Sequence, residues 1–231
     1  CGIVGGASER NILPVLVEGL KRLEYRGYDS AGVAFKKNGT ISVTKNLGRV
    51  DQLTKKLNLN TNQSNLGIAH TRWATHGIPS EKNAHPHYSK NIFVVHNGII
   101  ENHSDLKAYL KAEGIKFSTQ TDTEVIAHLI RVFIEKGQSF EKAVFNSIKK
   151  LKGAYALGII DKNNPEQIIG VRNKSPLVLG KGFQENFIAS DVMALAPVTN
   201  KFVYLDDGQV ALLTNQKAVV KNISSKIVRT Q

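Results

Sequence analysis

The sequence begins with "CGIVGG", residues Cys1–Gly6, and its single cysteine stands at the first position. The apolar pair Ile3 and Val4 between glycines predicts a short buried strand over residues 1–5. A cysteine at position 1 carries a thiol and an α-amine on the same residue, so a nucleophile and a base lie a few bonds apart. An α-amine with a pKa of roughly 7.7–8.0 is a usable base at neutral pH. The alternative is a small buried cysteine that only packs.

The composition favours an ordinary soluble globular protein, which we expect to be one domain over residues 1–231. No apolar run approaches the roughly 20 residues of a membrane span, and no signal peptide is recognisable. A lone cysteine fits a reducing, cytoplasmic setting. The formal net charge of +12 comes from scattered lysines rather than a block of like charges, so no nucleic-acid or membrane partner is expected. A basic module that binds a polyanion remains the rival from another class.

Apolar spacing and turn residues predict the helix, the hairpin and the loop within residues 12–65. Apolar residues recur at helical spacing from Ile12 to Leu23, which predicts a helix capped by Asn11 and ended before Gly27. Residues 31–35 and 41–45 read as a hairpin around an Asn-Gly turn. The polar segment 58–65 is expected to be a loop.

The rest of the chain groups its helices in the middle and its strands at both ends. Helices are expected at about 104–113, 123–136 and 139–151, and Thr121 with Glu124 has the spacing of a capping box before the second. Further strands are expected at 66–72, 91–95, 154–161, 167–171, 177–180, 186–189, 202–205 and 210–214. This order predicts an α+β fold with mainly antiparallel sheets, and not a βαβ fold.

Two motifs carry polar residues where apolar strands end. "VVHNGIIEN" places Asn97 and Gly98 at a strand end, where they form either a plain turn or a pair of donors for an oxyanion. "HTRWATHG" combines Arg72, Trp73, Thr75 and His76, which suits a small polar ligand; an exposed edge strand is the alternative.

The remaining polar candidates are an aspartate and the histidines. Asp122 in "TQTDTE" suits either a helix cap or a ligand ammonium, and the residues alone favour the cap. Six of the seven histidines lie between His70 and His103, and His85 and His87 are spaced like a ligand pair. No H-E-x-x-H motif or second cysteine accompanies them, so neither a metal nor another cofactor is expected.

Several motifs taken together closely resemble one family. "CGIVGG", "LEYRGYDSAG", "GIAHTRWATHG", "NAHPH", "VHNGIIEN", "TDTEVIAHLI" and "GAYAL" occur in this order and cover nearly the whole chain. They resemble the glutaminase domain of the glucosamine-6-phosphate synthases, which are class II glutamine amidotransferases. "YRGYDSAG" points to this member of the superfamily rather than to the purine or asparagine amidotransferases.

The resemblance implies an N-terminal nucleophile hydrolase fold, a four-layer αββα sandwich with two mainly antiparallel sheets. It implies that Cys1, freed by removal of the initiator methionine, attacks L-glutamine through a thioester while its own amine acts as the base. By the same resemblance, Asn97 and Gly98 form the oxyanion hole, and Arg26 positions the groups around Cys1. Arg72 binds the α-carboxylate of glutamine, Asp122 binds its α-ammonium, and the pocket is lined by Thr75, His76 and Gly98. Trp73 sits in a mobile loop that closes over glutamine and gates an ammonia channel, and the second layer of the site contains His85 and His96.

The resemblance also implies a larger protein. The full-length family members continue with a sugar isomerase half that converts fructose 6-phosphate to glucosamine 6-phosphate, and they are expected to be homodimers. That half is absent from residues 1–231, so the isolated domain is expected to release glutamate and ammonia to water. A glutaminase domain that serves phosphoribosyl pyrophosphate or aspartate remains the nearest alternative.

Overall fold

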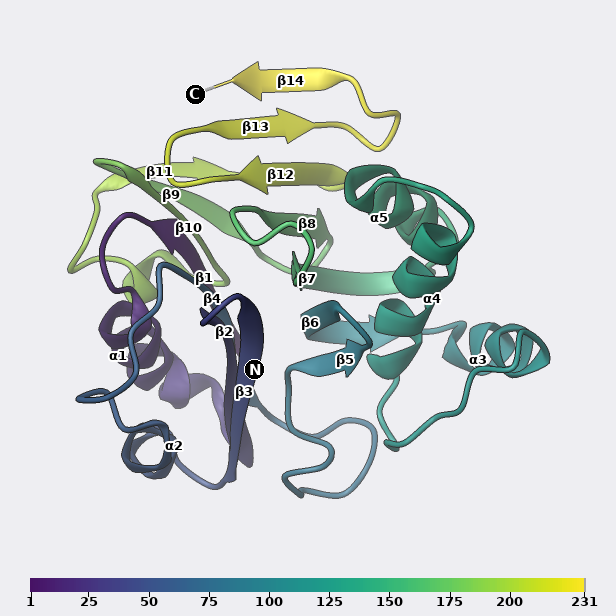
Figure 1. Ribbon diagram of the computed structural model, residues 1–231, viewed down its shortest axis with the longest axis horizontal. Helices are drawn as coiled ribbons and strands as arrows, with labels where there is room; N and C mark the ends of the chain where they lie inside the picture. The colour runs from purple at the N-terminus through teal and green to yellow at the C-terminus, as the bar shows by residue number, and fades with distance from the viewer. Residues whose placement is uncertain (231) are drawn as a thin grey trace.

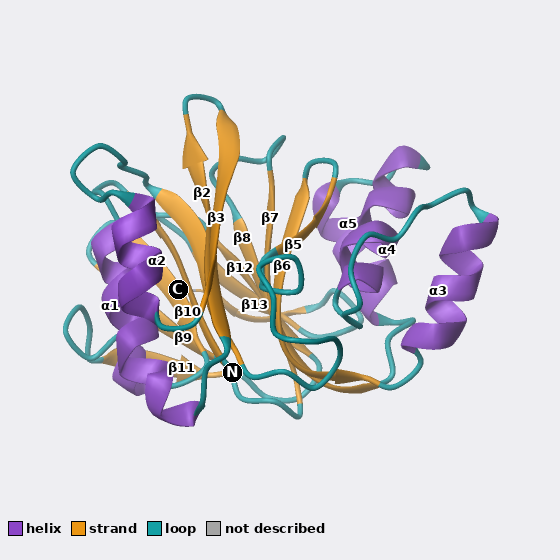
Figure 2. Cartoon of the chain, turned by 90° about the horizontal axis from the view of Figure 1, so that it is seen from below, coloured by secondary structure: helices purple, strands orange, loops and turns teal. Residues whose placement is uncertain are grey.

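The computed structural model describes residues 1–230, which form two seven-stranded sheets packed face to face between layers of helices (Figures 1 and 2). The first sheet has the order β11-β9-β10-β1-β4-β2-β3 and the second the order β14-β13-β12-β8-β7-β6-β5. Every pairing between neighbouring strands within these residues is antiparallel. The predicted α+β class with antiparallel sheets is confirmed.

The elements have the following bounds. The first sheet contains β1 (Gly2–Ser8), β2 (Ser30–Lys37), β3 (Thr40–Leu47), β4 (Leu66–Arg72), β9 (Val178–Gly182), β10 (Glu185–Ala189) and β11 (Lys201–Tyr204). The second sheet contains β5 (His87–Ser89), β6 (Ile92–Ile100), β7 (Gly153–Asp161), β8 (Ile168–Asn173), β12 (Gln209–Leu213), β13 (Ala218–Lys221) and β14 (Ile227–Thr230). The helices are α1 (Leu13–Leu23), α2 (Val50–Leu57), α3 (His103–Ala112), α4 (Glu124–Glu135) and α5 (Phe140–Ile148), with short 3₁₀ turns η1 (Glu24–Arg26) and η2 (Val192–Ala194).

Three apolar cores hold these layers together. One lies between the two sheets, one joins the first sheet to α1 and α2, and one joins the second sheet to α3, α4 and α5. Figure 2 shows α1 and α2 on one side of the strands and the other three helices on the opposite side. Burial of apolar surface in all three layers is the main driving force for this arrangement. Strand β1 lies in the middle of its sheet and is buried along its whole length.

Two predicted helix caps are wrong. Helix α1 has Ile12 at its N-cap, and the side chain of Asn11 accepts hydrogen bonds from Leu13 N at 3.3 Å and from Ser64 N at 2.9 Å. Asn11 therefore lies one residue before the N-cap, where it satisfies an N–H at the helix start and ties it to a distant loop. Helix α4 has Thr123 at its N-cap, so Thr121 and Glu124 form no capping box. The Glu124 carboxylate instead accepts from the backbone of the loop that precedes the helix.

Other differences concern short elements. Helix α2 and strands β5, β13 and β14 were not predicted, because two helical turns or three to four strand residues carry too little periodicity to stand out. The expected loop at 58–65 and the helix stop before Gly27 are confirmed.

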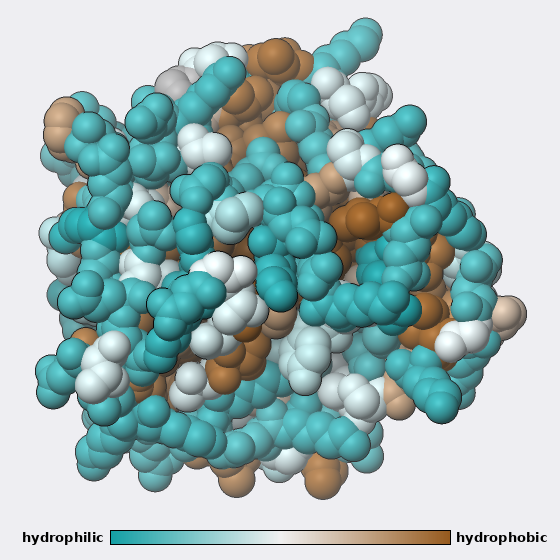
Figure 3. Space-filling view, in the orientation of Figure 1, coloured by the Kyte–Doolittle hydropathy of each residue, from teal (hydrophilic) through white to brown (hydrophobic). Residues whose placement is uncertain are grey.

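Figure 3 shows a largely hydrophilic face on which apolar side chains form small separate patches. Isolated exposed apolar residues of this kind are normal for a folded domain. Within residues 1–230, no helix combines the length and the apolar character needed to cross a membrane.

Candidate active site

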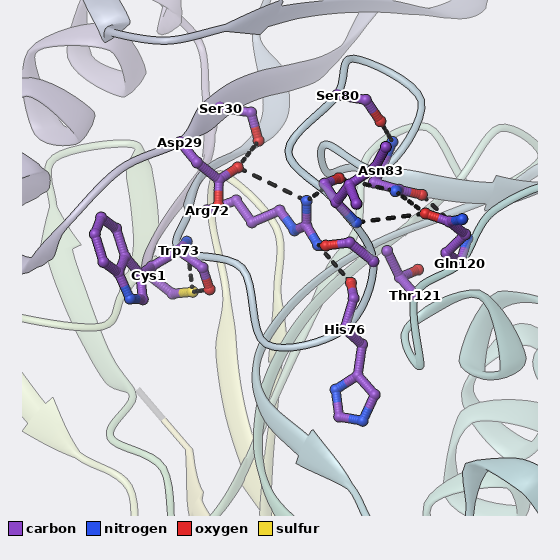
Figure 4. Close-up of polar contacts among 12 residues, drawn as sticks. Cys1, Asp29, Ser30, Arg72, Trp73, His76, Ser80, Asn83, Gln120 and Thr121 are labelled. Carbon is purple, nitrogen blue, oxygen red and sulfur yellow. Dashed lines mark hydrogen bonds and ion pairs between the residues drawn. The ribbon is translucent and has the colours of Figure 1, made fainter.

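The thiol of Cys1 lies at the end of two neighbouring central strands. Strand β1 pairs with β4 so that Gly2 lies opposite Thr71, which brings Cys1 beside the residues that follow β4. The Cys1 Sγ accepts a hydrogen bond from Trp73 N at 3.1 Å and donates one to Trp73 O at 3.4 Å (Figure 4). The backbone of Trp73, the first residue after β4, therefore fixes the position of the thiol.

The α-amine of Cys1 is electrostatically suited to act as a base. Its pKa is lowered below the ordinary value by burial and, secondly, by the positive charge of Arg26, while Asp29 acts in the opposite direction. A lower pKa means that more of the amine is neutral at neutral pH, and only the neutral form can accept a proton. Arg26 is held by η1 and donates a hydrogen bond to Ser190 O at 3.4 Å. Ser190 in turn accepts from Ile3 N at 3.0 Å, which ties this turn to β1.

A small pocket opens beside Cys1. It gathers most of the candidate residues from segments that are far apart in the sequence. Its lining consists of Cys1, Arg72, Trp73, Thr75, His76, His85, His96, Gly98, Thr121, Asp122 and Thr123. Asn97 and Arg26 lie outside this lining, although Asn97 directly precedes Gly98 and the charge of Arg26 acts on the Cys1 amine.

Arg72 is buried at the back of this pocket and holds the loop that follows β4. Its guanidinium donates to the carbonyl oxygens of His76, Gly77 (2.9 Å) and Ile78 (3.3 Å) (Figure 4). It also lies 3.7 Å from the Asp29 carboxylate. Burial lowers the pKa of Arg72, and the nearby carboxylates partly offset this effect. A guanidinium has five N–H donors; the three loop carbonyls engage both N–H groups of Nη2 and one of Nη1, and Nη1 also faces Asp29.

The loop beyond Arg72 is anchored at its far end and exposed in its middle. The Asn83 side chain donates to Ile78 O at 2.9 Å and to the Gln120 side chain at 3.0 Å, and it accepts from Gln120 N at 3.0 Å. Trp73 is 58% exposed and Ile78 68% exposed. Within the loop, the Thr75 hydroxyl lies 3.2 Å from His76 Nδ1. The base of the loop is thus fixed, while Trp73, which lines the pocket, and Ile78, which does not, are exposed.

Gly98 and Asn97 lie on β6, at the edge of the pocket. Gly98 has φ of +114°, and a Cβ there would overlap the carbonyl oxygen of Ala154 on β7. Only glycine fits this conformation at this spacing. The buried Asn97 side chain is held by His70, whose Nε2 lies 3.0 Å from Asn97 Oδ1.

Asp122 is not a helix cap, because Thr123 holds the N-cap of α4. One carboxylate oxygen of the buried Asp122 accepts from Ile100 N at 2.8 Å. No described residue donates to the other oxygen, and Asp122 lines the pocket. A carboxylate fixed in this way suits a ligand ammonium.

His85 and His96, which were expected behind the pocket, are among the residues that line it. His85 Nδ1 accepts from His96 N at 3.2 Å, and His96 Nδ1 lies 2.8 Å from the Thr123 hydroxyl. Burial lowers the pKa of both imidazoles, so both are neutral at physiological pH. Within residues 1–230, no group of three or more His, Cys, Asp or Glu side chains is arranged to hold a metal ion.

Three residues near Cys1 were not singled out from the sequence. Asp29 contacts Arg72 and acts on the Cys1 amine, His70 holds Asn97, and Thr123 holds His96. All three belong to the same motifs as the residues that were singled out. Their proximity to the site follows from strand pairing and not from any local pattern.

A hollow larger than the pocket beside Cys1 lies elsewhere, between the edge strands β3 and β5. Its lining includes Lys45, Lys56 and Glu81, and the last two form an ion pair of 2.7 Å. Burial lowers the pKa of Lys45 to about 8. The single cysteine is not part of this hollow, so its size alone does not make it the reaction site.

Sequence comparison supports a common family. A family model described as a glutamine amidotransferase domain matches residues 70–197. The glutamine–fructose-6-phosphate aminotransferase (isomerizing) of Acinetobacter baylyi is 53% identical over 99% of this chain and 37% of its own length. The enzyme of the same name from Escherichia coli K12 is 47% identical over 100% of this chain and 38% of its own length. The chain therefore spans less than two-fifths of these curated relatives.

Comparison with solved structures agrees. A glutamine phosphoribosylpyrophosphate amidotransferase from B. subtilis has a TM-score of 0.84 at 26% identity over 98% of this chain and 50% of its own. A glutamine aminotransferase class-II domain protein from Silicibacter pomeroyi has a TM-score of 0.65 at 13% identity over 96% of this chain and 99% of its own, and it shows the fold alone. The predicted N-terminal nucleophile hydrolase sandwich is confirmed. On its family match and on these relatives, the chain belongs to the glutamine amidotransferase domain family.

Proposed function

We propose that this chain hydrolyses L-glutamine to L-glutamate and ammonia, with Cys1 as the nucleophile. The observation that carries the proposal is a thiol and an α-amine of lowered pKa on one residue, at a pocket lined by Arg72, Gly98 and Asp122. The pocket thus combines a nucleophile, a base and charges of both signs.

The first half of the reaction forms a thioester. The neutral Cys1 amine accepts the thiol proton, and the thiolate attacks the side-chain carboxamide carbon of glutamine. The negative charge that develops on the oxygen is held by Asn97 Nδ2 and Gly98 N. When this intermediate collapses, the C–N bond breaks and the Cys1 ammonium returns its proton to the leaving nitrogen, so ammonia departs.

The second half restores the enzyme. The neutral amine accepts a proton from water, and the resulting hydroxide attacks the thioester carbon. The C–S bond breaks, the Cys1 ammonium returns its proton to the departing thiolate, and glutamate is released. Arg26 and burial favour the neutral amine in both halves, because both lower its pKa.

Recognition of the substrate depends on its zwitterionic end. The positive charge of Arg72 suits the α-carboxylate, whose oxygens would replace loop carbonyls that the guanidinium now holds, and the unpartnered oxygen of Asp122 suits the α-ammonium. Thr75 and His76 supply further polar contacts from the same loop. Trp73 lines the pocket next to the thiol, and its indole lies against Gly27.

We further propose an acceptor for the ammonia. The relatives at 53% and 47% identity are named for fructose 6-phosphate, which favours delivery to that sugar and formation of glucosamine 6-phosphate. This step belongs to the part of the longer relatives that the present chain does not span. Phosphoribosyl pyrophosphate is the second candidate, supported by the 26% identical solved structure.

The single cysteine of the chain is compatible with a reducing, cytoplasmic setting.

Ammonia release from L-glutamine tests the proposed hydrolysis. The 231-residue chain, with its free N-terminal cysteine confirmed by mass, should release equal amounts of ammonia and glutamate. Cys1→Ser should reduce the rate to background, because a hydroxyl is a much weaker nucleophile. A glutamine-like electrophile should label Cys1, and L-glutamine should protect against it. Equal rates from wild type and Cys1→Ser would refute the proposal.

A further inference from the structure

His70 links the two sheets beside the nucleophile. It lies on β4, opposite Ile3 of β1 and Gly32 of β2, and is fully buried. Its side chain leaves this sheet and reaches β6 of the other sheet, where Nε2 lies 2.9 Å from His96 O and 3.0 Å from Asn97 Oδ1. The charge of the Cys1 ammonium contributes to lowering the pKa of His70, so the imidazole also lies within electrostatic range of the nucleophilic residue.

The contacts of His70 determine which ring nitrogen carries the proton. A backbone carbonyl only accepts hydrogen bonds, so the nitrogen beside His96 O must be the donor, and Nε2 carries the hydrogen. Burial lowers the pKa of His70 well below its ordinary value and keeps the ring neutral, so Nδ1 carries none. Consistently, Nδ1 is buried without a partner, and the ring stacks on His85 at a centroid distance of 3.9 Å.

A donor at His70 Nε2 also determines the orientation of the Asn97 amide. The amide oxygen can accept from Nε2–H, whereas a flipped amide would place its own NH₂ group against that N–H. The terminal torsion of asparagine is broad and roughly two-fold, so this contact selects one of two orientations. Asn97 Nδ2 is thereby turned away from His70, and no described residue accepts a hydrogen bond from it.

We propose that His70 is a positioning residue that holds the Asn97 amide with its NH₂ group presented to the reacting carbonyl oxygen. This inference rests on the proposed glutamine hydrolysis, because only there does Asn97 Nδ2 have an oxyanion to stabilise. His70 does not touch the substrate; it acts through Asn97. Its neutral ring supplies this orientation over the whole physiological pH range.

Three variants of the 231-residue chain test the role of His70. His70→Leu removes the donor, and we expect kcat to fall about 10–100-fold while KM for glutamine stays within about threefold, because an oxyanion donor acts only in the transition state. His70→Gln places an amide N–H near the position of Nε2 and should restore most of kcat. Ile68→Ala is the matched control: it is fully buried two residues earlier on β4 and has no polar contact with Asn97. It should lower Tm but leave kcat within about threefold.

A double variant separates action through Asn97 from an independent effect. If His70 acts through Asn97, then His70→Leu combined with Asn97→Ala should be no slower than Asn97→Ala alone. The inference would be overturned if the fold-losses of kcat in the two single variants multiplied in the double variant. It would also be overturned if kcat fell equally in His70→Leu, His70→Gln and Ile68→Ala. A crystal structure of His70→Leu provides a readout independent of activity, because an Asn97 amide that keeps its wild-type orientation without His70 would also overturn the inference. Absence of ammonia release by the wild type would refute the proposed function instead.

Discussion

Replacement of Gly98 by alanine should damage both stability and catalysis, and the structure separates two causes. The first is backbone conformation: φ of +114° is unfavourable for any residue with a Cβ, by about 1 kcal/mol or more. The second is space: the new Cβ would overlap the Ala154 carbonyl oxygen, with the carbonyl carbon 2.9 Å away and Ser175 Oγ 3.0 Å away. Because Ala154 belongs to β7, the strand that pairs with β6, the collision can be relieved only if the two strands move apart.

The expected magnitude follows from adding the two effects. Overpacking of this kind costs about 1–3 kcal/mol, so the free energy of unfolding should fall by roughly 2–4 kcal/mol. In a domain of this size that corresponds to a Tm lowered by roughly 4–16 °C. The strand movement also displaces Gly98 N and Asn97. A misplacement of about 1 Å at a reacting centre can lower kcat about 100-fold.

Gly208→Ala is the matched control. Gly208 also has a positive φ, of +78°, but no atom lies within 4 Å of an added Cβ. It should therefore lose only the conformational part, about 1 kcal/mol or roughly 2–4 °C in Tm, with unchanged kcat. Thermal unfolding and ammonia release measured on both variants give the comparison. If Gly98→Ala matches Gly208→Ala in both Tm and kcat, the argument about the strand pair and the oxyanion donor is wrong.

Three further predictions concern the base, the substrate and the terminus. Arg26→Gln removes a positive charge that lowers the pKa of the Cys1 amine, so this pKa should rise and the acid limb of the kcat/KM profile should move to higher pH. Asp29→Asn removes a negative charge that raises the same pKa, so the acid limb should move to lower pH, and shifts of the two variants in the same direction would contradict the assignment of the base. Arg72→Lys and Asp122→Asn should each raise KM for glutamine about 10-fold or more, because lysine keeps the charge but not the planar set of donors, and asparagine loses the charge; unchanged KM values in both would return Asp122 to a structural role. A residue retained ahead of Cys1 converts its amine to a non-basic amide, so ammonia release should fall to background although the chain folds; wild-type rates would show that the amine is not the base.

The motifs of the sequence identified most of the pocket, because the chemistry resides in residue types and short spacings. Asn97 and Gly98 after one apolar run, and Arg72 with His76 after another, were recognisable as candidate polar contacts without any tertiary information. The predicted strand end at residue 95 is wrong, because β6 continues through Asn97 and Gly98 to Ile100 and both residues pair with β7, so they form no turn. The same local view misjudged Asp122, whose position before a helix favoured a cap. Its carboxylate is instead drawn to Ile100 N, a backbone group on β6.

The two predictions of helix caps were wrong for a related reason. The spacing of Thr121 and Glu124 fits a capping box, but Glu124 finds its donors at Ser118 and Thr119 in the preceding loop. Asn11 likewise satisfies Ser64 N, more than 50 residues away. Buried polar groups take whichever partner the packed chain supplies, so a local pattern names a candidate and not its partner.

The sequence by itself therefore predicted a candidate nucleophile and determined the class of fold and most of the pocket residues, since periodicity and motif chemistry are local properties. Only the tertiary structure decided that β1 lies between β4 and β10, and hence that Asp29, Arg26 and His70 surround Cys1. Strand order depends on burying both faces of two sheets at once, and no spacing along the chain encodes it. The electrostatics of the Cys1 amine and the orientation of Asn97 follow from that order, because charges and hydrogen bonds act through space between segments that the sequence keeps far apart.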